Sequence, residues 1–374
     1  MKKYDLVVYG ATGFTGHLIS EYVAERAAEL GTLRWALAGR SLDKLRTVRD
    51  ELALGDVPLI EADIANPDSI RDMVRSTRLV LTTVGPYALY GEAVVAACAE
   101  EGTDYVDLTG EPHWMRRMID AYATTAEASG ARILFACGFD SIPSEFGVWI
   151  LQEAAIARFG KPLTHVRGRY VDFVGGPGGG SMATGMAMSQ AAAADAEVAA
   201  LLADPFALTP GFTGPAQPTG LEPGVDPDLG PVQPFFLGPT NVKNVHRSNM
   251  LLKHRFGTDL VYDEMLVGEP NTQAMPPAML KPGEGPTREA MNNGHFEIRF
   301  IGTDNEGHRL TSSVSSTKDP GFMTTSRMIT ETALCLLDSP EVTPGIWTPV
   351  AALHDKLLDR LQERSFMTIR VLPD

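Results

Sequence analysis

The run Gly10-Ala-Thr-Gly-Phe-Thr-Gly16 decides the fold, because it joins an apolar run at residues 6–9 to a pattern of helical spacing at residues 14–23. Glycine at the first position permits a tight turn. Glycine at the second lets backbone approach a pyrophosphate, and glycine at the third lets helix and strand pack closely. The helix N-terminus supplies free N–H groups for an anion. The run therefore predicts a nucleotide-binding loop formed by Gly10, Ala11, Thr12, Gly13, Phe14, Thr15 and Gly16.

The alternation of strand and helix patterns continues through the first third of the chain. Further strands are expected at residues 35–38, 57–60, 79–84, 105–108 and 132–136, with helical patterns between them. Strands separated by helices pair in parallel through right-handed crossovers. The sequence therefore predicts an α/β fold with a doubly wound parallel sheet of the Rossmann type.

The residues that follow the next strands indicate which nucleotide binds. The second strand ends at Gly39-Arg40-Ser41, where NAD enzymes place an acidic residue for the ribose hydroxyls. Arg40 and Ser41 suit a 2′-phosphate, because guanidinium binds phosphate bidentately. The pattern thus favours NADP over NAD. Further cofactor contacts are expected after the third and fourth strands, from Asp63 and from Thr83, Val84, Gly85 and Pro86.

Polar residues at the carboxyl ends of the strands are candidates for chemistry. Ligands bind at this edge in open α/β sheets, so substrate contact or proton transfer is expected from Tyr87, Glu111, Asp140 and Ser141. The alternative is structural, because Asp and Ser after a strand often cap the next helix. No tyrosine is followed four residues later by lysine, so the Tyr-x-x-x-Lys pair of short-chain dehydrogenases is absent.

Composition limits the partners. With 47 acidic against 32 basic residues the formal charge is −15, which disfavours nucleic acid and anionic lipid surfaces. The three cysteines show no CxxC spacing, which indicates a reduced, cytoplasmic setting. The histidines form no group with metal-ligand spacing, so no metal is expected. No run approaches the roughly 20 apolar residues of a transmembrane helix.

The pattern changes after about residue 145. Residues 205–240 are rich in Pro and Gly and are expected to form an irregular excursion or lid. Alternating runs at 296–301 and 309–315 predict a β-hairpin. The expected domains are an NADP-binding Rossmann domain at 1–145 and an α+β substrate or interface domain at 146–323. Residues 324–374 are expected to supply C-terminal helices and a strand that return to the first domain.

Motifs along nearly the whole chain resemble one family. They include Tyr9-Gly-Ala-Thr-Gly-Phe-Thr-Gly16, Trp35-Ala-Leu-Ala-Gly-Arg40, Thr83-Val-Gly-Pro-Tyr87, Tyr105-Val-Asp-Leu-Thr-Gly-Glu111, Ala136-Cys-Gly-Phe-Asp-Ser-Ile-Pro143 and Asp319-Pro-Gly-Phe322. This set resembles the saccharopine dehydrogenase-like oxidoreductases, in the subgroup with trans-acting enoyl reductases. The resemblance implies an NADP(H)-dependent enzyme with an inserted α+β domain. It also implies reduction of an activated C=C bond in a lipid or polyketide-like acyl substrate.

Two other functions stay open on the sequence. A saccharopine-type enzyme would oxidise or reduce a C–N bond of an amino-acid substrate, and its pocket would need basic residues. Residues 175–240 contain no Lys or Arg, which disfavours this reading. A non-catalytic nucleotide-binding or lipid-associated scaffold is the second alternative. The sequence leaves the substrate, the proton donor, the direction of reaction and the assembly open, a homodimer included.

Overall fold

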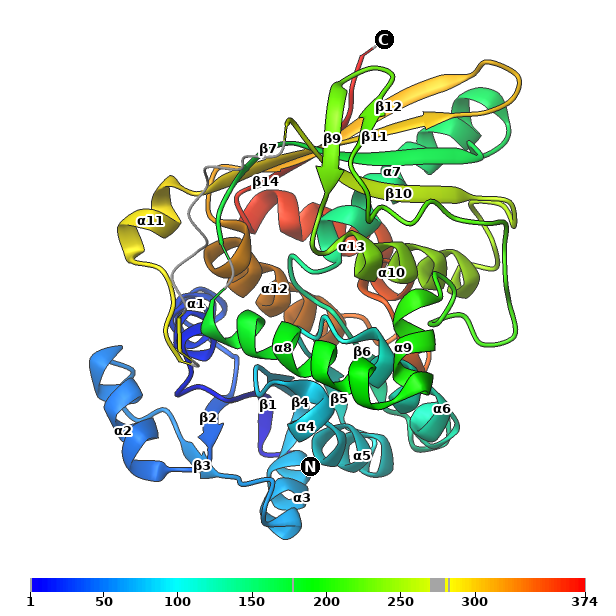
Figure 1. The fold of residues 1–374 in the computed structure, drawn as a ribbon. Coiled ribbons are helices and arrows are strands. Elements are labelled where there is room, and N and C mark those ends of the chain that lie inside the picture. The colour runs from blue at the N-terminus through cyan, green and yellow to red at the C-terminus, as the bar shows by residue number, and fades with distance from the viewer. Residues whose placement is uncertain (1, 177, 270–279, 282, 374) are drawn as a thin grey trace.

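The computed structural model describes residues 2–176, 178–269, 280–281 and 283–373, and it contains two seven-stranded sheets (Figure 1). Sheet A has the strand order β13-β6-β5-β4-β1-β2-β3, and sheet B has the order β14-β12-β11-β7-β10-β9-β8. In Figure 1 sheet A lies below sheet B, and helices fill the space between them.

Sheet A is parallel at every pairing, as the sequence predicts. Its strands are β1 (Tyr4–Tyr9), β2 (Trp35–Gly39), β3 (Leu59–Glu61), β4 (Thr77–Thr82), β5 (Asp104–Val106), β6 (Arg132–Leu134) and β13 (Gly345–Trp347). From β1 the chain winds outward in both directions, with β2 on one side and β4 on the other. The order therefore reverses at β1, and the crevice that this reversal opens lies at the carboxyl ends of β1 and β4.

Helices cover both faces of sheet A. They are α1 (Phe14–Leu30), α2 (Leu42–Glu51), α3 (Pro67–Ser76), α4 (Tyr87–Tyr90), α5 (Glu92–Glu101), α6 (Pro112–Ser129) and α12 (Thr325–Leu337). Alternate residues of β1 point to different cores: Leu6 packs with α1 and α12, and Val7 packs with α3, α5 and α6. Capping residues bound two of these helices. Asn66 accepts a hydrogen bond from the backbone N–H of Ser69 at the start of α3, and Gly102 ends α5 in the left-handed region.

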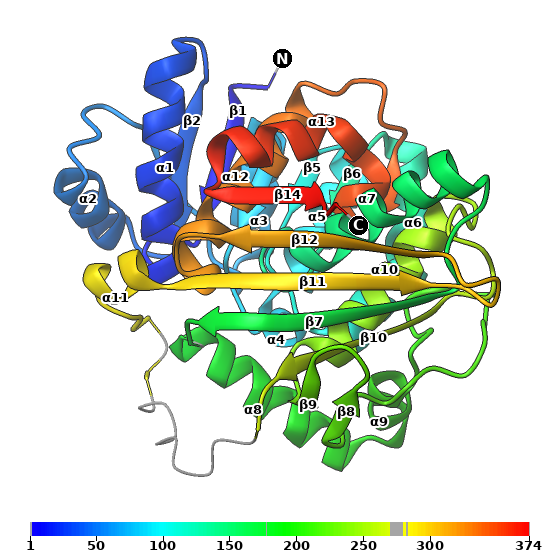
Figure 2. The same ribbon diagram turned by 90° about the horizontal axis from the view of Figure 1, so that it is seen from above.

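Sheet B is mixed, with β7 and β10 parallel and its other pairings antiparallel. Its strands are β7 (His165–Val174), β8 (Gly224–Asp226), β9 (Gly230–Pro234), β10 (Val261–Val267), β11 (His295–Thr303), β12 (Arg309–Ser316) and β14 (Met367–Val371). The predicted hairpin is confirmed as β11–β12. Helices α7 (Ile142–Phe159), α10 (Gly238–Leu251) and α13 (Pro349–Arg364) pack on the sheet, and Figure 2 shows them behind its strands.

One expectation about the second half of the chain is wrong, and a second holds only in part. The C-terminal strand joins β12 of sheet B instead of returning to sheet A, because its alternation of buried Met367 and Ile369 with exposed residues suits a half-covered antiparallel sheet. A different late strand, β13, is the one that joins sheet A. The stretch 205–240 is also less irregular than expected, since it contains β8 and β9 at the edge of sheet B.

The remaining helices follow strands of sheet B in the chain. They are α8 (Gly179–Ala194), α9 (Ala196–Ala203), α11 (Arg288–Asn293) and the short π-helix η1 (Pro320–Thr324). Helices α8 and α9 are separate because Asp195 between them is extended and its side chain caps α9. Among the described residues, no helix is long and apolar enough to cross a membrane.

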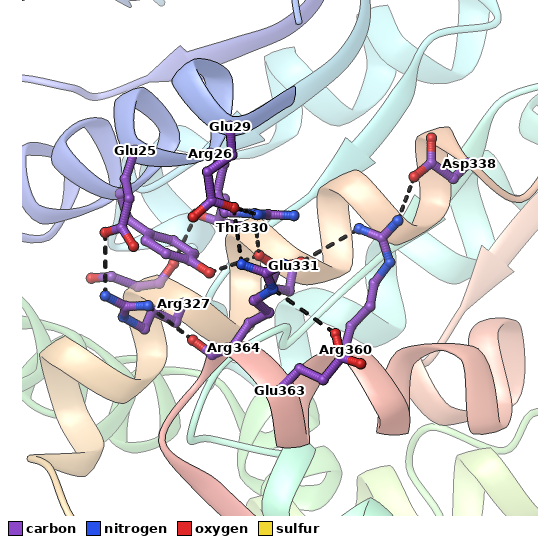
Figure 3. Close-up of polar contacts among 12 residues, drawn as sticks. Glu25, Arg26, Glu29, Arg327, Thr330, Glu331, Asp338, Arg360, Glu363 and Arg364 are labelled. Carbon is purple, nitrogen blue, oxygen red and sulfur yellow. Dashed lines mark hydrogen bonds and ion pairs between the residues drawn. The ribbon is translucent and has the colours of Figure 1, made fainter. Parts of the chain in front are cut away.

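A buried ion network joins α1 to the C-terminal helices (Figure 3). Glu331 on α12 is fully buried. Its carboxylate accepts a hydrogen bond from the Tyr22 hydroxyl at 2.7 Å and lies 2.8 Å from Nε of Arg26, and Arg360 of α13 approaches from the other side at 3.4 Å. Because each partner compensates the desolvation of the carboxylate, this network fixes the orientation of the helix that follows the glycine loop.

Candidate functional site

The glycine loop has the shape that a pyrophosphate requires. Gly10 adopts φ +92°, a conformation that L side chains rarely take, and a Cβ there would lie 2.7 Å from Oγ1 of Thr83. A Cβ on Gly16 would collide with the carbonyl of Gly10. Both positions therefore need glycine on steric grounds, as the sequence predicts.

The loop ends at the start of α1, which leaves backbone donors for an anion. Gly13 is the N-cap residue in extended conformation, and no side chain caps the helix. The first backbone N–H groups of a helix have no acceptor within it. Here they belong to Phe14, Thr15 and Gly16, while the Thr12 side chain is exposed beside them. These donors and the positive end of the helix dipole suit a diphosphate.

Arg40 and Asp63 lie after β2 and β3, at the edge where an adenosine would sit. Arg40 is exposed and makes no hydrogen bond or ion pair with the part of the chain that the structure describes. Ser41 caps α2 by accepting from the N–H of Lys44. Asp63 accepts from the N–H of Ala65. Tyr9 ends β1 opposite Ala38 of β2, and burial raises the pKa of its hydroxyl to about 12.

The segment after β4 lies directly beside the glycine loop. The backbone N–H of Thr83 donates to the carbonyl of Tyr9 at 3.0 Å, and its hydroxyl donates to the carbonyl of Gly10 at 3.3 Å. Val84 is half-buried, and the Gly85–Pro86 peptide is cis. The structure thus brings residues 83–86 together with residues 10–16, as the sequence predicts.

Tyr87 and Glu111 form internal supports of this edge. The Tyr87 hydroxyl donates to the carbonyl of Thr82 at 3.2 Å and accepts from the N–H of Leu108 at 3.1 Å. Glu111 accepts from the N–H groups of Tyr87 and Ala88 at 2.6 and 2.9 Å, and burial raises the pKa of its carboxyl. Both polar groups are therefore occupied in joining the ends of β4 and β5 to α4 and α6.

Ser141 is also occupied. It is fully buried and donates to the carboxylate of Glu145 one turn later on α7. Glu145 also accepts from the Ser248 hydroxyl at 2.6 Å and from the N–H of Val350 at 3.4 Å. The Ser141 side chain therefore belongs to a buried junction of α7, α10 and α13.

Asp140 differs from these neighbours because its carboxylate has no such partner. It follows β6 and is half-buried. A Cβ built on Gly110, in the loop after β5, would lie 3.7 Å from its Cγ. Burial raises the pKa of Asp140 to about 6, and among the described residues no hydrogen bond or ion pair reaches its carboxylate. It is thus a titratable group that is free to exchange a proton at the carboxyl edge of sheet A.

Asp107 and Phe139 also shape this edge, although the sequence did not single them out as site residues. Asp107 accepts from the N–H of Ala136 at 2.9 Å and from the Tyr105 hydroxyl at 2.9 Å, and burial raises its pKa to about 7. It therefore fixes the loop that carries Asp140. Phe139 packs on Phe296 of sheet B with ring centroids 4.9 Å apart. The position of both after β5 and β6 was the only signal in the sequence.

The comparisons with known proteins agree with this geometry. The family model described as saccharopine dehydrogenase NADP binding domain matches residues 6–134. A trans-acting enoyl reductase of Mycobacterium tuberculosis is 35% identical over 422 residues, 96% of each chain. One of Mycobacterium ulcerans is 34% identical over 423 residues, 97% of this chain and 96% of that protein. The chain belongs to the saccharopine dehydrogenase-like oxidoreductase family.

Solved structures of other members of this broad fold group support the architecture alone. Saccharopine dehydrogenase (L-Glu forming) of Saccharomyces cerevisiae covers 99% of this chain with a TM-score of 0.54 and 8% identity. The homospermidine synthase of Legionella pneumophila, a complex with NAD, covers 100% of this chain with a TM-score of 0.53 and 12% identity. This saccharopine dehydrogenase-like oxidoreductase carries its glycine loop, Arg40 and Glu111 inside the matched NADP-binding segment, whereas Asp140 and sheet B lie beyond it.

Proposed function

We propose that this oxidoreductase uses NADP(H) to reduce an activated C=C bond of a lipid or polyketide-like acyl substrate. The observation that carries the reaction type is the similarity, over 96% of both chains, to a trans-acting enoyl reductase. When bound, a nicotinamide cofactor supplies a hydride. The chain itself must then hold the cofactor, position the acyl group and supply a proton to the carbon next to the activating carbonyl.

Arg40 supports NADP as the cofactor. Its guanidinium is exposed and makes no ion pair among the described residues, and no carboxylate stands at the end of β2, where NAD enzymes need one. An unpaired guanidinium at this position suits a 2′-phosphate, which it can bind with two parallel hydrogen bonds. Ser41 follows at the start of α2 and adds a hydroxyl at the same corner.

Asp140 is the group that we assign as proton donor. A general acid works best when its pKa lies near the working pH, and burial brings that of Asp140 to about 6. Tyr87, Glu111 and Ser141 instead contribute by holding the ends of the strands. Their polar atoms are already paired inside the protein.

Exposed apolar side chains around this edge support an acyl substrate. Leu89 and Tyr90 of α4, which follow the cis-proline, are 62% and 40% exposed. Met186 of α8 is 54% exposed, and α8 carries no charged residue along its 16 residues. Apolar surface left open beside polar groups is typical of a ligand-binding site.

The test is a titration of the protein with NADPH and with NADH, followed by nicotinamide fluorescence, for the unaltered protein and Arg40→Ala. Arg46→Ala is the matched control, because Arg46 is an exposed arginine of α2 whose side chain pairs with Asp43. We expect Arg40→Ala to weaken NADPH binding by about 1.5 to 3 kcal/mol and to leave NADH unchanged. Equal affinity for both cofactors in the unaltered protein would refute the NADP assignment.

The reaction is tested separately by offering enoyl thioesters with NADPH and measuring the loss of nicotinamide absorbance. Turnover that fails in Asp140→Asn while NADPH still binds supports the assigned proton donor. Cofactor binding without turnover of any enoyl thioester, but with oxidation of an amino-acid C–N bond, would replace the proposed reaction by the saccharopine type.

A further inference from the structure

We propose that Phe322 is a positioning residue for the cofactor, which holds the glycine loop in shape through a contact with Phe14. Phe322 belongs to η1, which follows β12 in the chain, so a segment from outside the matched NADP-binding segment completes the cofactor site. The inference rests on the proposed binding of NADP(H) and adds a residue to that site.

The contact between the two rings is direct. Phe14 and Phe322 pack edge to face, with ring centroids 5.1 Å apart and an interplanar angle of 88°. Phe322 is 6% exposed and forms a small apolar cluster with Leu18 of α1 and Met291 of α11. Aromatic pairs of this geometry add stabilisation beyond the area that they bury.

Two glycines allow other backbone segments to close on the same pair of rings. A Cβ on Gly285 would collide with the ring of Phe14, and a Cβ on Gly178 would collide with the ring of Phe322. The two segments are joined to each other, since the N–H of Gly179 donates to the carbonyl of Glu284 at 3.3 Å. The backbone at residues 178–179 and 284–285 therefore encloses the two rings closely.

Hydrogen bonds and an ion pair hold the segments around the two rings in place. The Asp319 carboxylate accepts from the N–H of Phe322 at 2.6 Å and from the N–H of Met323 at 3.2 Å, and its own N–H donates to the carbonyl of Met291 at 3.0 Å. Arg288 of α11 pairs with Glu21 of α1 at 2.7 Å. Figure 2 shows α11 beside the N-terminal end of α1, which directly follows the glycine loop.

The position of Phe14 gives this contact its consequence. Phe14 is the first residue of α1 and directly follows the N-cap Gly13. A shift of its ring therefore moves the backbone N–H groups that would face the pyrophosphate. The 2′-phosphate corner at Arg40 lies after β2 and shares no residue with the cluster. Loss of Phe322 should thus weaken recognition of the pyrophosphate and spare recognition of the 2′-phosphate.

The experiment measures dissociation constants for NADPH and for adenosine 2′-monophosphate, which lacks the pyrophosphate, in the unaltered protein and in Phe322→Ala. We expect the constant for NADPH to rise about tenfold, the size of one lost charge-assisted hydrogen bond. The constant for adenosine 2′-monophosphate should stay unchanged, and Phe322→Leu should recover part of the NADPH affinity. Phe256→Ala is the control, because Phe256 is as deeply buried but packs against Trp149.

Gly285→Ala gives a second perturbation that removes no buried ring. Its added Cβ would push Phe14, whereas Gly180→Ala adds a Cβ in open space and serves as its control. Unchanged NADPH affinity in Phe322→Ala and Gly285→Ala would overturn the inference, as would an equal loss of both ligands. No NADPH binding by the unaltered protein would instead overturn the proposed cofactor, and this inference with it.

Discussion

Replacing Asp140 by asparagine should make the protein more stable and less active, and the structure gives the size of the first effect. Burial raises the pKa of Asp140 from 3.8 to about 6. Because a tenfold change in proton affinity is worth about 1.4 kcal/mol, ionised Asp140 costs the folded state up to about 3 kcal/mol. Asparagine has nearly the same shape and carries no charge, so it avoids that cost.

The direction of the pKa shift of Asp140 determines the pH range in which the stability effect appears. A carboxyl whose folded pKa lies above its unfolded pKa stabilises the fold at low pH, and that contribution is lost as the pH rises from 3.8 to about 6. Asp140→Asn should therefore match the unaltered protein near pH 4 and exceed its stability by up to about 3 kcal/mol at pH 8. Urea unfolding at several pH values, followed by circular dichroism, measures the difference.

Asp56→Asn is the matched control, since Asp56 is exposed in the loop between α2 and β3. It should leave the free energy of unfolding unchanged at every pH. A pH-independent difference between Asp140→Asn and the unaltered protein would refute the reasoning, because it would show that Asp140 titrates alike in the folded and unfolded chains. A loss of stability at pH 8 would show a partner for its carboxylate.

Three further changes test the rest of the site and its support. Gly16→Ala should abolish NADPH binding, because its Cβ would collide with the Gly10 carbonyl. Gly31→Ala, which has open space at its Cβ, is the control for the stability effect of replacing a helix-end glycine. NADPH binding that survives Gly16→Ala would contradict the loop assignment. Glu331→Ala should lower the free energy of unfolding by about 3 to 5 kcal/mol, as expected for a broken buried ion pair, and urea unfolding near that of the unaltered protein would contradict it. Glu111→Gln should cost about 1 to 3 kcal/mol of stability, because one of the two carboxylate oxygens that accept from Tyr87 and Ala88 becomes an NH2 donor. It should leave the pH dependence of turnover unchanged, and a shifted pH profile would contradict its structural assignment.

The sheet that carries the glycine loop could be predicted from the sequence because its signals are local. Continuous apolar strands, glycine-terminated helices and the cap at Asn66 each depend on residues within one turn or strand. Sheet B was less predictable. Helix α10 was missed because nine of its residues are polar or small and yet buried, among them Asn241, Lys243 and Arg247. A buried polar helix lacks the apolar stripe on which such predictions rest. The division at residues 145 and 323 stays a prediction.

The candidate site was predictable as a place but not as a set of roles. Parallel strands bring their carboxyl ends to one edge, so Tyr87, Glu111, Asp140 and Ser141 were expected together. Which of these side chains lacks a hydrogen-bond partner depends on residues far along the chain. Ser248 and Val350, for example, donate hydrogen bonds to Glu145, the partner of Ser141. No spacing rule carries that information. Likewise, nothing near Phe14 announces that Phe322, some three hundred residues later in the chain, packs on its ring.

The hydrogen bonding of the four candidate side chains explains why Asp140 is the residue to test first. Three of the four candidate polar side chains at this edge, those of Tyr87, Glu111 and Ser141, are already paired inside the protein. Asp140 is left half-buried and without a partner among the described residues, at a cost in stability that asparagine would avoid. An unpartnered, partly buried carboxylate carries a cost for which a function is expected to compensate. A proton donor has that property, because hydrogen bonds accepted from N–H groups favour an ionised carboxylate, which has no proton to give.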